Sequence, residues 1–583
     1  MKLDPVNIMI GGEAGQGLAT VGELLSRILV RGGYSIVVTQ SYQSRIRGGH
    51  NTYTVRAGTG DLEAPREPID ILVALNGETI EKHRPELAGG GVILAGESFA
   101  EESDACLAMP LGAFAQETYR NTGALGVVCA VLGLDRETAA GSVTEAFGKK
   151  KPEVADSNRD AFLAGYAWAE KQSSYARKLP AAAKRGARLM LNGNQAIALG
   201  AVSAGARFCS FYPMTPSTSI PLTLIGLADK MGLIVEQAED EIAAVNMAIG
   251  ASFAGAPCMV ATSGGGFALM VEGVSLAAMT ETPIVIVVAQ RPGPATGLPT
   301  RTEQADLEFV AFAGHGEFPR AILAPGTVEE CFHLTRAAFD LAERYQGPMF
   351  VLTDQFLADS LRAVEPFDVT HLDRVRPGGD PGSIEAPYLR HRVTEGGVSP
   401  RLVPGAGAHL VVTDSDEHTE DGHLTEDLSE RTRQVDKRLA KVRGIAAGVI
   451  PPVYTGDDAP DLLLVSWGST RGAVREAASL VSSGNGGSVW EAMDEIRADG
   501  GTVGTLHFPQ VWPLVPEQFL GHLERAKRVV CVEGNATGQL ANLIRRASGF
   551  DITERIGRYD GLPITPEYIS RALESMGGTG GGA

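Results

Sequence analysis

Short apolar runs alternate with amphipathic stretches along most of the chain, a pattern that is typical of α/β domains. At the N-terminus, residues 6–10 read as a strand, residues 11–17 as a glycine-rich loop and residues 18–33 as a helix. The apolar stripe of this helix is formed by Val21, Leu24, Leu25 and Ile28. Further strands are predicted at residues 34–40, 51–58, 70–75 and 90–96. The pattern predicts multidomain α/β architecture with parallel sheets.

Changes in composition divide the chain into segments. The polar, basic stretch 176–190 reads as a linker. The stretch 366–455 is irregular and rich in Pro, Gly and charge, with a helix predicted at residues 430–444. The predicted α/β domains occupy residues 1–175, 191–365 and 456–576. The glycine-rich end, residues 577–583, is expected to be disordered.

Composition excludes several classes of partner. The chain has 583 residues and a net charge of −19, so neither nucleic acid nor an anionic membrane surface is an expected partner. Its N-terminus lacks a signal-peptide pattern and its apolar runs are too short to span a bilayer, so we expect a cytoplasmic protein. The cysteines are isolated, at positions Cys106, Cys129, Cys209, Cys258, Cys331 and Cys531. Without a C-x-x-C pair, the chain is predicted to hold neither zinc nor an iron–sulfur cluster.

The glycine loop 11–17 lies between a predicted strand and a predicted helix, where backbone N–H groups favour an anion. Its glycines are Gly11, Gly12, Gly15 and Gly17. The spacing matches neither the dinucleotide fingerprint nor the P-loop. A phosphate-bearing ligand and a plain tight turn are therefore equally good readings.

A second loop, residues 212–220, follows a predicted strand and carries hydroxyls on Thr215, Ser217 and Thr218. Loops at the carboxyl ends of parallel strands bind small ligands, and hydroxyls suit a carbonyl or carboxylate oxygen. The alternative is a capped helix start, with Ser217 or Thr218 as the N-cap.

The stretch 236–252 places four carboxylates before a helix of small residues. Asp240 is expected to cap this helix, and acids favour its positive end. The predicted stripe of small residues consists of Ala244, Ala248, Ala251 and Gly255. Such a stripe lets another backbone pack closely, so little water surrounds Glu241. Its pKa should be raised, which would let it share a proton with a basic heterocycle.

Taken together, the segments 212–220, 239–273 and 290–307 resemble the α subunit of 2-oxoacid:ferredoxin oxidoreductases. Residues 11–17 and 41–56 resemble the γ subunit of that family, here fused in front of the α part. The stretch 417–441 and the C-terminal domain are similar to the remainder of the α subunit. The resemblance implies a γ-like domain, a pyrimidine-binding domain and a transketolase C-terminal-like domain.

The resemblance also implies an activity. Members cleave a 2-oxoacid to carbon dioxide and an acyl-CoA, reducing ferredoxin, with thiamine diphosphate, coenzyme A and iron–sulfur clusters. The reverse reaction is a reductive carboxylation, as in a reductive tricarboxylic acid cycle. In this family a Glu contacts the aminopyrimidine ring of the coenzyme and promotes its imino tautomer. The context Glu-x-Ala-Ala matches Glu241, with Glu239 as the second choice.

Several further residues follow from the same resemblance. Thr215 matches a Thr near the substrate, with Ser217 and Thr218 beside it, and Arg291 matches an Arg that binds the substrate carboxylate. Thr296 is the expected helper of Arg291, and Gly265 joins Glu241 in the cofactor-binding set. The alternative for Arg291 is a solvent-facing loop residue.

In the γ-like domain the resemblance suggests coenzyme A contacts. The glycine loop would take the phosphates, helped by Arg45 and Arg47. The alternative role of these two arginines is a subunit interface rather than a contact with coenzyme A.

The chain contains no Gly-Asp-Gly and no Asn-Asn, the motif that normally anchors the diphosphate through Mg²⁺. Mg²⁺ and a 4Fe-4S cluster are therefore expected on a separate β subunit, in an (αβ)2 heterotetramer that reduces ferredoxin. 2-Oxoglutarate is the preferred substrate because the fused layout resembles that subgroup; pyruvate or a branched-chain 2-oxoacid is the alternative. A noncatalytic CoA- or nucleotide-binding electron-transfer module is the rival from another class.

Two weaker candidates complete the set. The acidic stretch 414–427 contains His418 and His423, for which a metal site is weighed against a solvated charge run. His315 and Arg320 are candidates for a distal substrate carboxylate, with a packed loop as the alternative.

Overall fold

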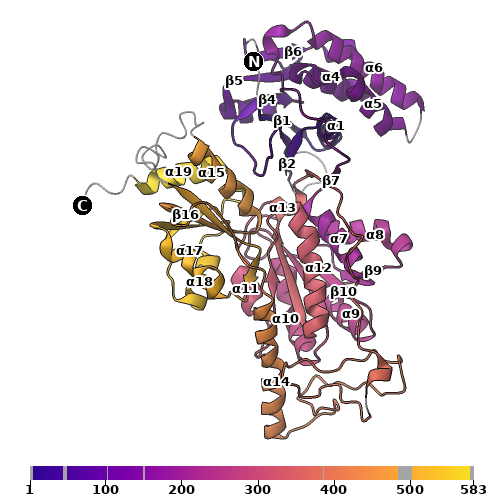
Figure 1. Cartoon of the computed structure of the whole chain (residues 1–583). Coiled ribbons are helices and arrows are strands. Elements are labelled where there is room, and N and C mark those ends of the chain that lie inside the picture. Colours follow the sequence, from indigo (N-terminus) through magenta and orange to yellow (C-terminus); the bar gives the residue numbers. More distant parts are fainter. Residues whose placement is uncertain are drawn as a thin grey trace. The chain divides into compact units, whose positions relative to one another are not determined.

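The computed structural model describes residues 4–43, 49–101, 103–148, 152–384, 386–483 and 502–577 (Figure 1). The chain forms two compact units. Unit 1 comprises Met1–Leu191, Ser360–Phe367 and Thr565–Glu567, and unit 2 comprises Asn192–Asp359, Asp368–Ile564 and Tyr568–Ala583. The predicted disordered tail, residues 577–583, lies outside the described residues except for Gly577, which is the last residue of a helix. The domain ranges predicted from the sequence stay predictions.

Unit 1 is built on an eight-stranded sheet in the order β6-β5-β4-β1-β3-β2-β14-β7. Its strands are β1 (Val6–Glu13), β2 (Ser35–Ser41), β3 (His50–Gly58), β4 (Ile69–Ala74), β5 (Leu87–Gly96), β6 (Cys106–Met109), β7 (Leu189–Leu191) and β14 (Arg362–Val364). The early strands were predicted correctly, but a fully parallel sheet was not. β3 runs antiparallel to both β1 and β2, because only residues 42–49 separate β2 from β3, too few for the crossover that a parallel pair needs.

The helices of unit 1 include α1 (Leu18–Arg31), α2 (Gly77–His83), α3 (Leu111–Phe114), α4 (Arg120–Leu132), α5 (Arg136–Gly148) and α6 (Pro152–Ala169). α1 buries the predicted stripe of Val21, Leu24, Leu25 and Ile28. α4 and α6 touch at the backbone, since a Cβ at Gly126 would collide with Phe162 O and one at Gly165 with Gly123 O. Glycine permits this close approach.

The main sheet of unit 2 has the order β18-β12-β13-β11-β10-β8-β9, and every neighbouring pair except β12–β18 is parallel. Its strands are β8 (Phe208–Phe211), β9 (Ile234–Gln237), β10 (Cys258–Thr262), β11 (Ile284–Gln290), β12 (Ile322–Leu323), β13 (Pro348–Asp354) and β18 (Gln510–Trp512). The associated helices are α7 (Gly193–Ala204), α8 (Ser219–Met231), α9 (Glu241–Phe253), α10 (Gly264–Met279), α11 (Leu307–Phe312), α12 (Val328–Tyr345) and α13 (Gln355–Asp359). α9 packs on α10 and α7 on α12.

A second sheet in unit 2 has the order β15-β17-β16-β19-β20. Its strands are β15 (Val453–Thr455), β16 (Leu462–Trp467), β17 (Val503–Phe508), β19 (Arg528–Glu533) and β20 (Glu554–Gly557). The remaining helices are α14 (Leu428–Ala447), α15 (Arg471–Ser483), α17 (Leu520–Arg525), α18 (Gln539–Ser548) and α19 (Pro566–Gly577). α14, the long orange helix of Figure 1, confirms the helix predicted in the irregular segment. Within the described residues, no helix is both long enough and apolar enough to cross a bilayer.

Candidate active site

The main sheet of unit 2 changes direction of winding at β8. β9 lies on one side of β8 and β10 on the other, so the connections that leave β8 and β10 diverge. A crevice at the carboxyl ends of parallel strands is the usual place for a ligand in such sheets. Three connections end there: the loop after β8 with Thr215, the entry to α9 with Glu241, and the entry to α10 with Ser263.

The four carboxylates before α9 divide into distinct roles. Asp240 is the N-cap, and its Oδ1 accepts a hydrogen bond of 2.7 Å from Ala243 N, as predicted. Glu236 and Glu239 are exposed. Glu241, the first helical residue, is only 3% exposed. The structure therefore favours Glu241 over Glu239 as the buried acid.

Glu241 lies against the start of α10. A Cβ added at Gly266 would be 2.5 Å from Glu241 Oε1 and would collide with Thr262 Oγ1, so only glycine leaves room for the carboxylate. Glu241 Oε1 is buried without a hydrogen-bond partner among the described residues. Burial raises the pKa of this carboxyl, and the nearby negative charge of Asp240 adds to the effect.

The buried face of α9 differs from the predicted stripe. Ala244 and Ala248 are fully buried, as expected, but Ala251 is only partly buried. Gly255 lies beyond the helix, with φ near +94°. The rest of the buried face is formed by Val245, Ile249 and Ser252. The predicted stripe lies at one edge of the buried face, and its last position falls in the turn after the helix.

The loop after β8 is held from two directions. Arg291, which follows β11, donates a hydrogen bond of 2.7 Å from Nη1 to Thr215 O. Asn194, fully buried near the start of α7, donates to Pro216 O at 2.8 Å and to Ser219 Oγ at 2.7 Å. The structure therefore brings Arg291 to Thr215. The sequence analysis missed Asn194, because its two partners lie 22 and 25 positions further along the chain, too far for a local signal.

The hydroxyls of this loop do not cap α8. Thr218 occupies the N-cap position but its side chain makes no capping bond, and Ser217 Oγ donates to Met214 O at 2.7 Å. The alternative reading is therefore right about the N-cap position of Thr218, but neither hydroxyl caps the helix through its side chain. Ser217 is 1% exposed and its hydroxyl already has a backbone partner. The partly exposed residues among the three candidates are therefore Thr215 and Thr218.

Arg291 faces a residue that the sequence analysis did not single out. Burial lowers the pKa of the Arg291 guanidinium, and the negative charge of Asp306 opposes that shift. Asp306 lies at the start of α11, and its backbone N–H donates to Gln290 Oε1 at 2.9 Å. Arg291 is partly buried, so the reading of a solvent-facing loop residue does not hold.

Gly265 and Thr296 lie around the same opening. Gly265 is exposed in the first turn of α10, and a Cβ there would be 3.6 Å from Ala295 O. Thr296 is exposed in the turn after Arg291. The turn itself is tight, with Ala295 at φ 55° and Gly297 at φ 49°.

Buried polar atoms without partners gather at this end of the sheet. Among the described residues, no hydrogen bond reaches Asn194 Oδ1, Glu241 Oε1, Ser263 Oγ or Asp306 Oδ2. Leaving such atoms unpaired costs about 1–3 kcal/mol each, so natural proteins rarely collect them without a purpose. A polar ligand at the carboxyl ends of β8, β10 and β11 would supply the missing partners.

The predicted glycine loop 11–17 is shorter in the structure, because Gly11 and Gly12 belong to strand β1 and pair with β3. The rest of the segment has the backbone expected of a strand-to-helix turn. Gly15 and Gly17 have φ of 95° and 76°, and Gly17 precedes α1 without a side-chain cap. Gly11 packs on Thr79, whereas a Cβ at Gly15 would meet nothing within 4 Å. Both readings of the loop, phosphate site and tight turn, are compatible with this geometry. Arg45 and Arg47 lie outside the described residues.

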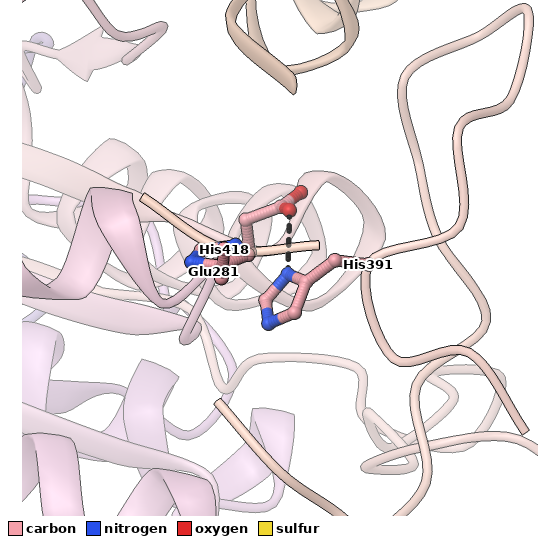
Figure 2. A group of neighbouring side chains, drawn as sticks. All are labelled: Glu281, His391 and His418. Atoms are coloured by element: carbon pink, nitrogen blue, oxygen red, sulfur yellow. Dashed lines mark hydrogen bonds and ion pairs between the residues drawn. The ribbon is translucent and has the colours of Figure 1, made fainter. Parts of the chain in front are cut away.

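The two histidines weighed as candidate metal ligands, His418 and His423, lie in different surroundings. His423 is exposed and pairs with Asp421 at 3.3 Å. His418 is fully buried beside Glu281 and His391, and Figure 2 shows the hydrogen bond of 3.0 Å between His391 Nδ1 and Glu281 Oε1.

These three buried side chains have the geometry of a metal site but not its charge. Lys437 Nζ pairs with Glu281 Oε1, and Lys441 Nζ lies 2.5 Å from Glu281 Oε2. Two ammonium groups already outnumber the single carboxylate, so a divalent cation would add charge to a buried site with an excess of it. The pKa of Glu281 is held well below its usual range by Lys441 and Lys437, which overcome the effect of burial. We interpret the group as a structural ion network.

His315 and Arg320 lie in a packed loop. Arg320 Nη1 donates to Val310 O at 2.8 Å, and its guanidinium lies 4.3 Å from the centre of the Phe318 ring. Arg320 is 6% exposed, whereas His315 is exposed. The packed-loop alternative explains Arg320 better than a contact with a substrate carboxylate.

Comparison with family models explains this arrangement. The model described as pyruvate flavodoxin/ferredoxin oxidoreductase, thiamine diphosphate-binding, matches residues 199–437. The model described as pyruvate ferredoxin/flavodoxin oxidoreductase matches residues 7–168. The first match covers Glu241, Ser263 and Asp306, three of the four residues with unpaired polar atoms. The fold and the site therefore define a thiamine diphosphate-binding α/β oxidoreductase subunit.

Two relatives and one solved structure show which oxidoreductase family the chain belongs to. The 2-oxoacid:ferredoxin oxidoreductase subunit alpha of a Sulfolobus species is 31% identical over 97% of this chain and 96% of its own. The 2-oxoglutarate oxidoreductase subunit KorA of Mycobacterium tuberculosis is 27% identical, covering 98% and 92%. A 2-oxoglutarate:ferredoxin oxidoreductase from Magnetococcus marinus, solved with 2-oxoglutarate, coenzyme A and succinyl-CoA bound, has a TM-score of 0.89, 29% identity and coverage of 98% and 99%. The chain belongs to the α subunits of the 2-oxoacid:ferredoxin oxidoreductase family.

Proposed function

We propose that this chain is the γ–α fused subunit of a CoA-acylating 2-oxoglutarate:ferredoxin oxidoreductase. The enzyme converts 2-oxoglutarate and coenzyme A to succinyl-CoA and carbon dioxide, reversibly, while reducing ferredoxin. The observation that carries the proposal is the buried, unpaired Oε1 of Glu241 beside Gly266, at the carboxyl ends of the sheet.

The residues at this site fit one half of thiamine diphosphate. Glu241 would hold a nitrogen of the aminopyrimidine ring, and the raised pKa of its carboxyl keeps a proton available for sharing with that ring. Gly265 is exposed at the start of α10 and leaves space there for a planar ring, while Gly266 makes room for the Glu241 carboxylate. When bound, the coenzyme supplies the carbon nucleophile and the electron sink for decarboxylation.

The residues around Arg291 fit the substrate carboxylate. A guanidinium binds a carboxylate through two parallel hydrogen bonds, and the Arg291 guanidinium is positioned by its bond to Thr215 O. Thr215 and Thr218 offer hydroxyls at the same opening, and Thr296 is placed to assist from the turn after Arg291. Ser217 acts through the loop backbone rather than through a free hydroxyl.

A β subunit is the proposed partner and supplies the rest of the centre. This chain lacks the usual diphosphate-anchoring motif and clustered cysteines, so Mg²⁺ and a 4Fe-4S cluster are assigned to the β subunit. Large apolar side chains are exposed beside the site, on α8, α9 and α10: Leu222, Ile225, Ile242, Met247 and Leu269. Exposed apolar patches of this kind mark subunit contacts. We expect an (αβ)2 heterotetramer in the cytoplasm.

The choice of 2-oxoglutarate is supported by the KorA relative and by the ligands named for the Magnetococcus structure. A second candidate is a broader 2-oxoacid range that includes pyruvate or branched-chain 2-oxoacids, because the Sulfolobus relative is named only for 2-oxoacids. We assign coenzyme A to unit 1, with Gly11, Gly12, Gly15 and Gly17 at its phosphates and Arg45 and Arg47 as further contacts.

The test is Glu241→Ala in the complex assembled with its β subunit. We expect 2-oxoglutarate- and CoA-dependent viologen reduction to fall by at least about 10²-fold, the size of a lost acid–base group, while the subunits still assemble. Glu236→Ala is the matched control, since Glu236 is exposed in the same run of acids. Unchanged turnover in Glu241→Ala would remove this residue from the mechanism. If the wild-type complex were inactive with every 2-oxoacid, the result would support a noncatalytic CoA- or nucleotide-binding electron-transfer module instead.

A further inference from the structure

A second acid, Asp306, packs against the start of α10 although it belongs to the start of α11. It contacts α10 at Gly264, whereas Glu241 contacts that helix at Gly266. A Cβ added at Gly264 would lie 2.6 Å from Asp306 Cγ and 2.7 Å from its Oδ1, while the same addition at Gly266 would meet Glu241. The Ser263–Gly266 turn is therefore flanked by two carboxylates, and glycine is required at both contacts.

The position of Asp306 at a helix start does not account for its side chain. It occupies the N-cap position of α11, yet its carboxylate makes no capping bond. Asp306 Oδ2 is instead buried, with no hydrogen-bond partner among the described residues. An N-cap Asp normally accepts from the backbone of the next turn, so the orientation toward α10 needs another explanation.

The charges around Asp306 come from three elements. Arg291 at the end of β11 attracts it, and Glu303 in the loop before α11 repels it. Glu241 lies across the α10 start. Burial raises the pKa of Asp306 to about 6, with Arg291 opposing the shift. Asp306 is therefore poised to gain or lose a proton near neutral pH.

We propose that Asp306 is a positioning residue that takes up one proton from solvent when a 2-oxoacid carboxylate binds to Arg291. This inference rests on the proposed function of Arg291. In the free subunit the backbone N–H of Asp306 donates to the side chain of Gln290, the residue before Arg291, and the charges of Asp306 and Arg291 attract each other. Once the substrate carboxylate binds the Arg291 guanidinium, an ionised Asp306 would be a buried anion beside the bound carboxylate. The proton removes this repulsion and leaves Asp306 Oδ2 as an O–H donor toward the substrate.

The proposal links substrate affinity to pH with a definite sign. Below about pH 6 Asp306 is already protonated, so substrate binding moves no proton. Above that pH each bound 2-oxoacid must bring one proton with it, and the apparent affinity weakens by up to about tenfold per pH unit. The effect falls on KM rather than on kcat.

The experiment measures KM and kcat for the best 2-oxoacid between pH 5.5 and 8.5, using the assembled complex with saturating CoA and viologen. We expect the wild-type KM to rise about tenfold or more from pH 6 to pH 8. Asp306→Asn, which keeps the shape and removes the charge, should give a KM that varies less than about twofold and lies below the wild-type value at pH 8. Arg291→Ala should raise KM at every pH.

Two control variants separate Asp306 from its neighbours. Glu303→Gln removes the repelling charge, so the rise in KM should begin at lower pH but keep its slope. Glu308→Gln changes an acid of the same helix whose Oε1 accepts from Asn542, and should leave the profile as in the wild type. A wild-type slope in Asp306→Asn, or a flat wild-type profile, overturns the proposal. Loss of all 2-oxoacid turnover in the wild type would instead overturn the proposed function.

Discussion

Glu241 and Glu281 are both buried in unit 2, yet their surroundings are opposite. Glu281 is in contact with Lys437, Lys441 and His391, and its pKa is held far below the usual range. Glu241 has an unpaired oxygen, a neighbouring acid in Asp240 and a raised pKa. Burial alone therefore does not distinguish a functional acid from a structural one.

The difference lies in which groups satisfy each carboxylate. The partners of Glu281 come from α14 and from the segment around His391, so the network fastens the irregular part of the chain to the end of α10. Glu281 also keeps a strained backbone, with φ of 51°, which the network holds in place. Glu241 has no such partners, and the missing contacts are those that a bound cofactor would make.

The largest expected effect is on stability in Glu281→Gln. The amide leaves Lys437 and Lys441 buried without a counter-charge, so the free energy of unfolding at pH 7 should fall by about 3–5 kcal/mol. Because the folded pKa of Glu281 is depressed, its contribution is fully present above the unfolded pKa of about 4.3 and is lost as pH falls toward the folded pKa. Denaturant unfolding of the wild type and the variant at pH 7 and pH 3 measures both the loss of stability and its dependence on pH.

The matched variant Glu241→Gln should lose no stability under the same conditions. Equal losses in both variants would erase the distinction between the two glutamates.

An intermediate effect is expected for Gly266→Ala. The added Cβ meets Glu241 Oε1 and Thr262 Oγ1, so overpacking should cost about 1–3 kcal/mol and displace the acid. Turnover of the assembled complex should fall together with the thermal midpoint. The control is Gly141→Ala in α5, where a Cβ would meet nothing within 4 Å and helix propensity predicts a gain of about 0.5–1 kcal/mol. A fully active Gly266→Ala variant would show that Glu241 needs no glycine beside it.

The smallest expected effect is a gain in stability for Glu241→Gln that depends on pH. The folded pKa of Glu241 is raised, so ionising it in the folded chain costs stability, fully so above the folded pKa and not at all well below the unfolded pKa of about 4.3. Removing the charge should therefore stabilise the chain by about 0.5–2 kcal/mol at pH 8 and have no effect near pH 3.5. Thermal unfolding at the two pH values checks this, and a loss at pH 8 would contradict the raised pKa.

Local patterns predicted much of the site. The Asp240 cap, the strands β1 to β5 and the helix α14 depend on neighbouring residues, so their signals lie within a few positions of each other. Glu241 and Arg291 were identified through resemblance of their surrounding motifs. The misses were contacts between distant segments: Asn194 on the Thr215 loop, Asp306 against Gly264, and the lysines around Glu281.

By itself, the sequence determined the α/β class, the helix caps and the residue types that the chemistry requires, because periodicity and capping act over one or two turns of the chain. Only the tertiary structure decided which of the acids are buried and which buried acids are paired. Desolvation and ion pairing depend on distant segments, such as those of Glu281 and Lys437, which are 156 residues apart, and no local pattern records which of them will meet.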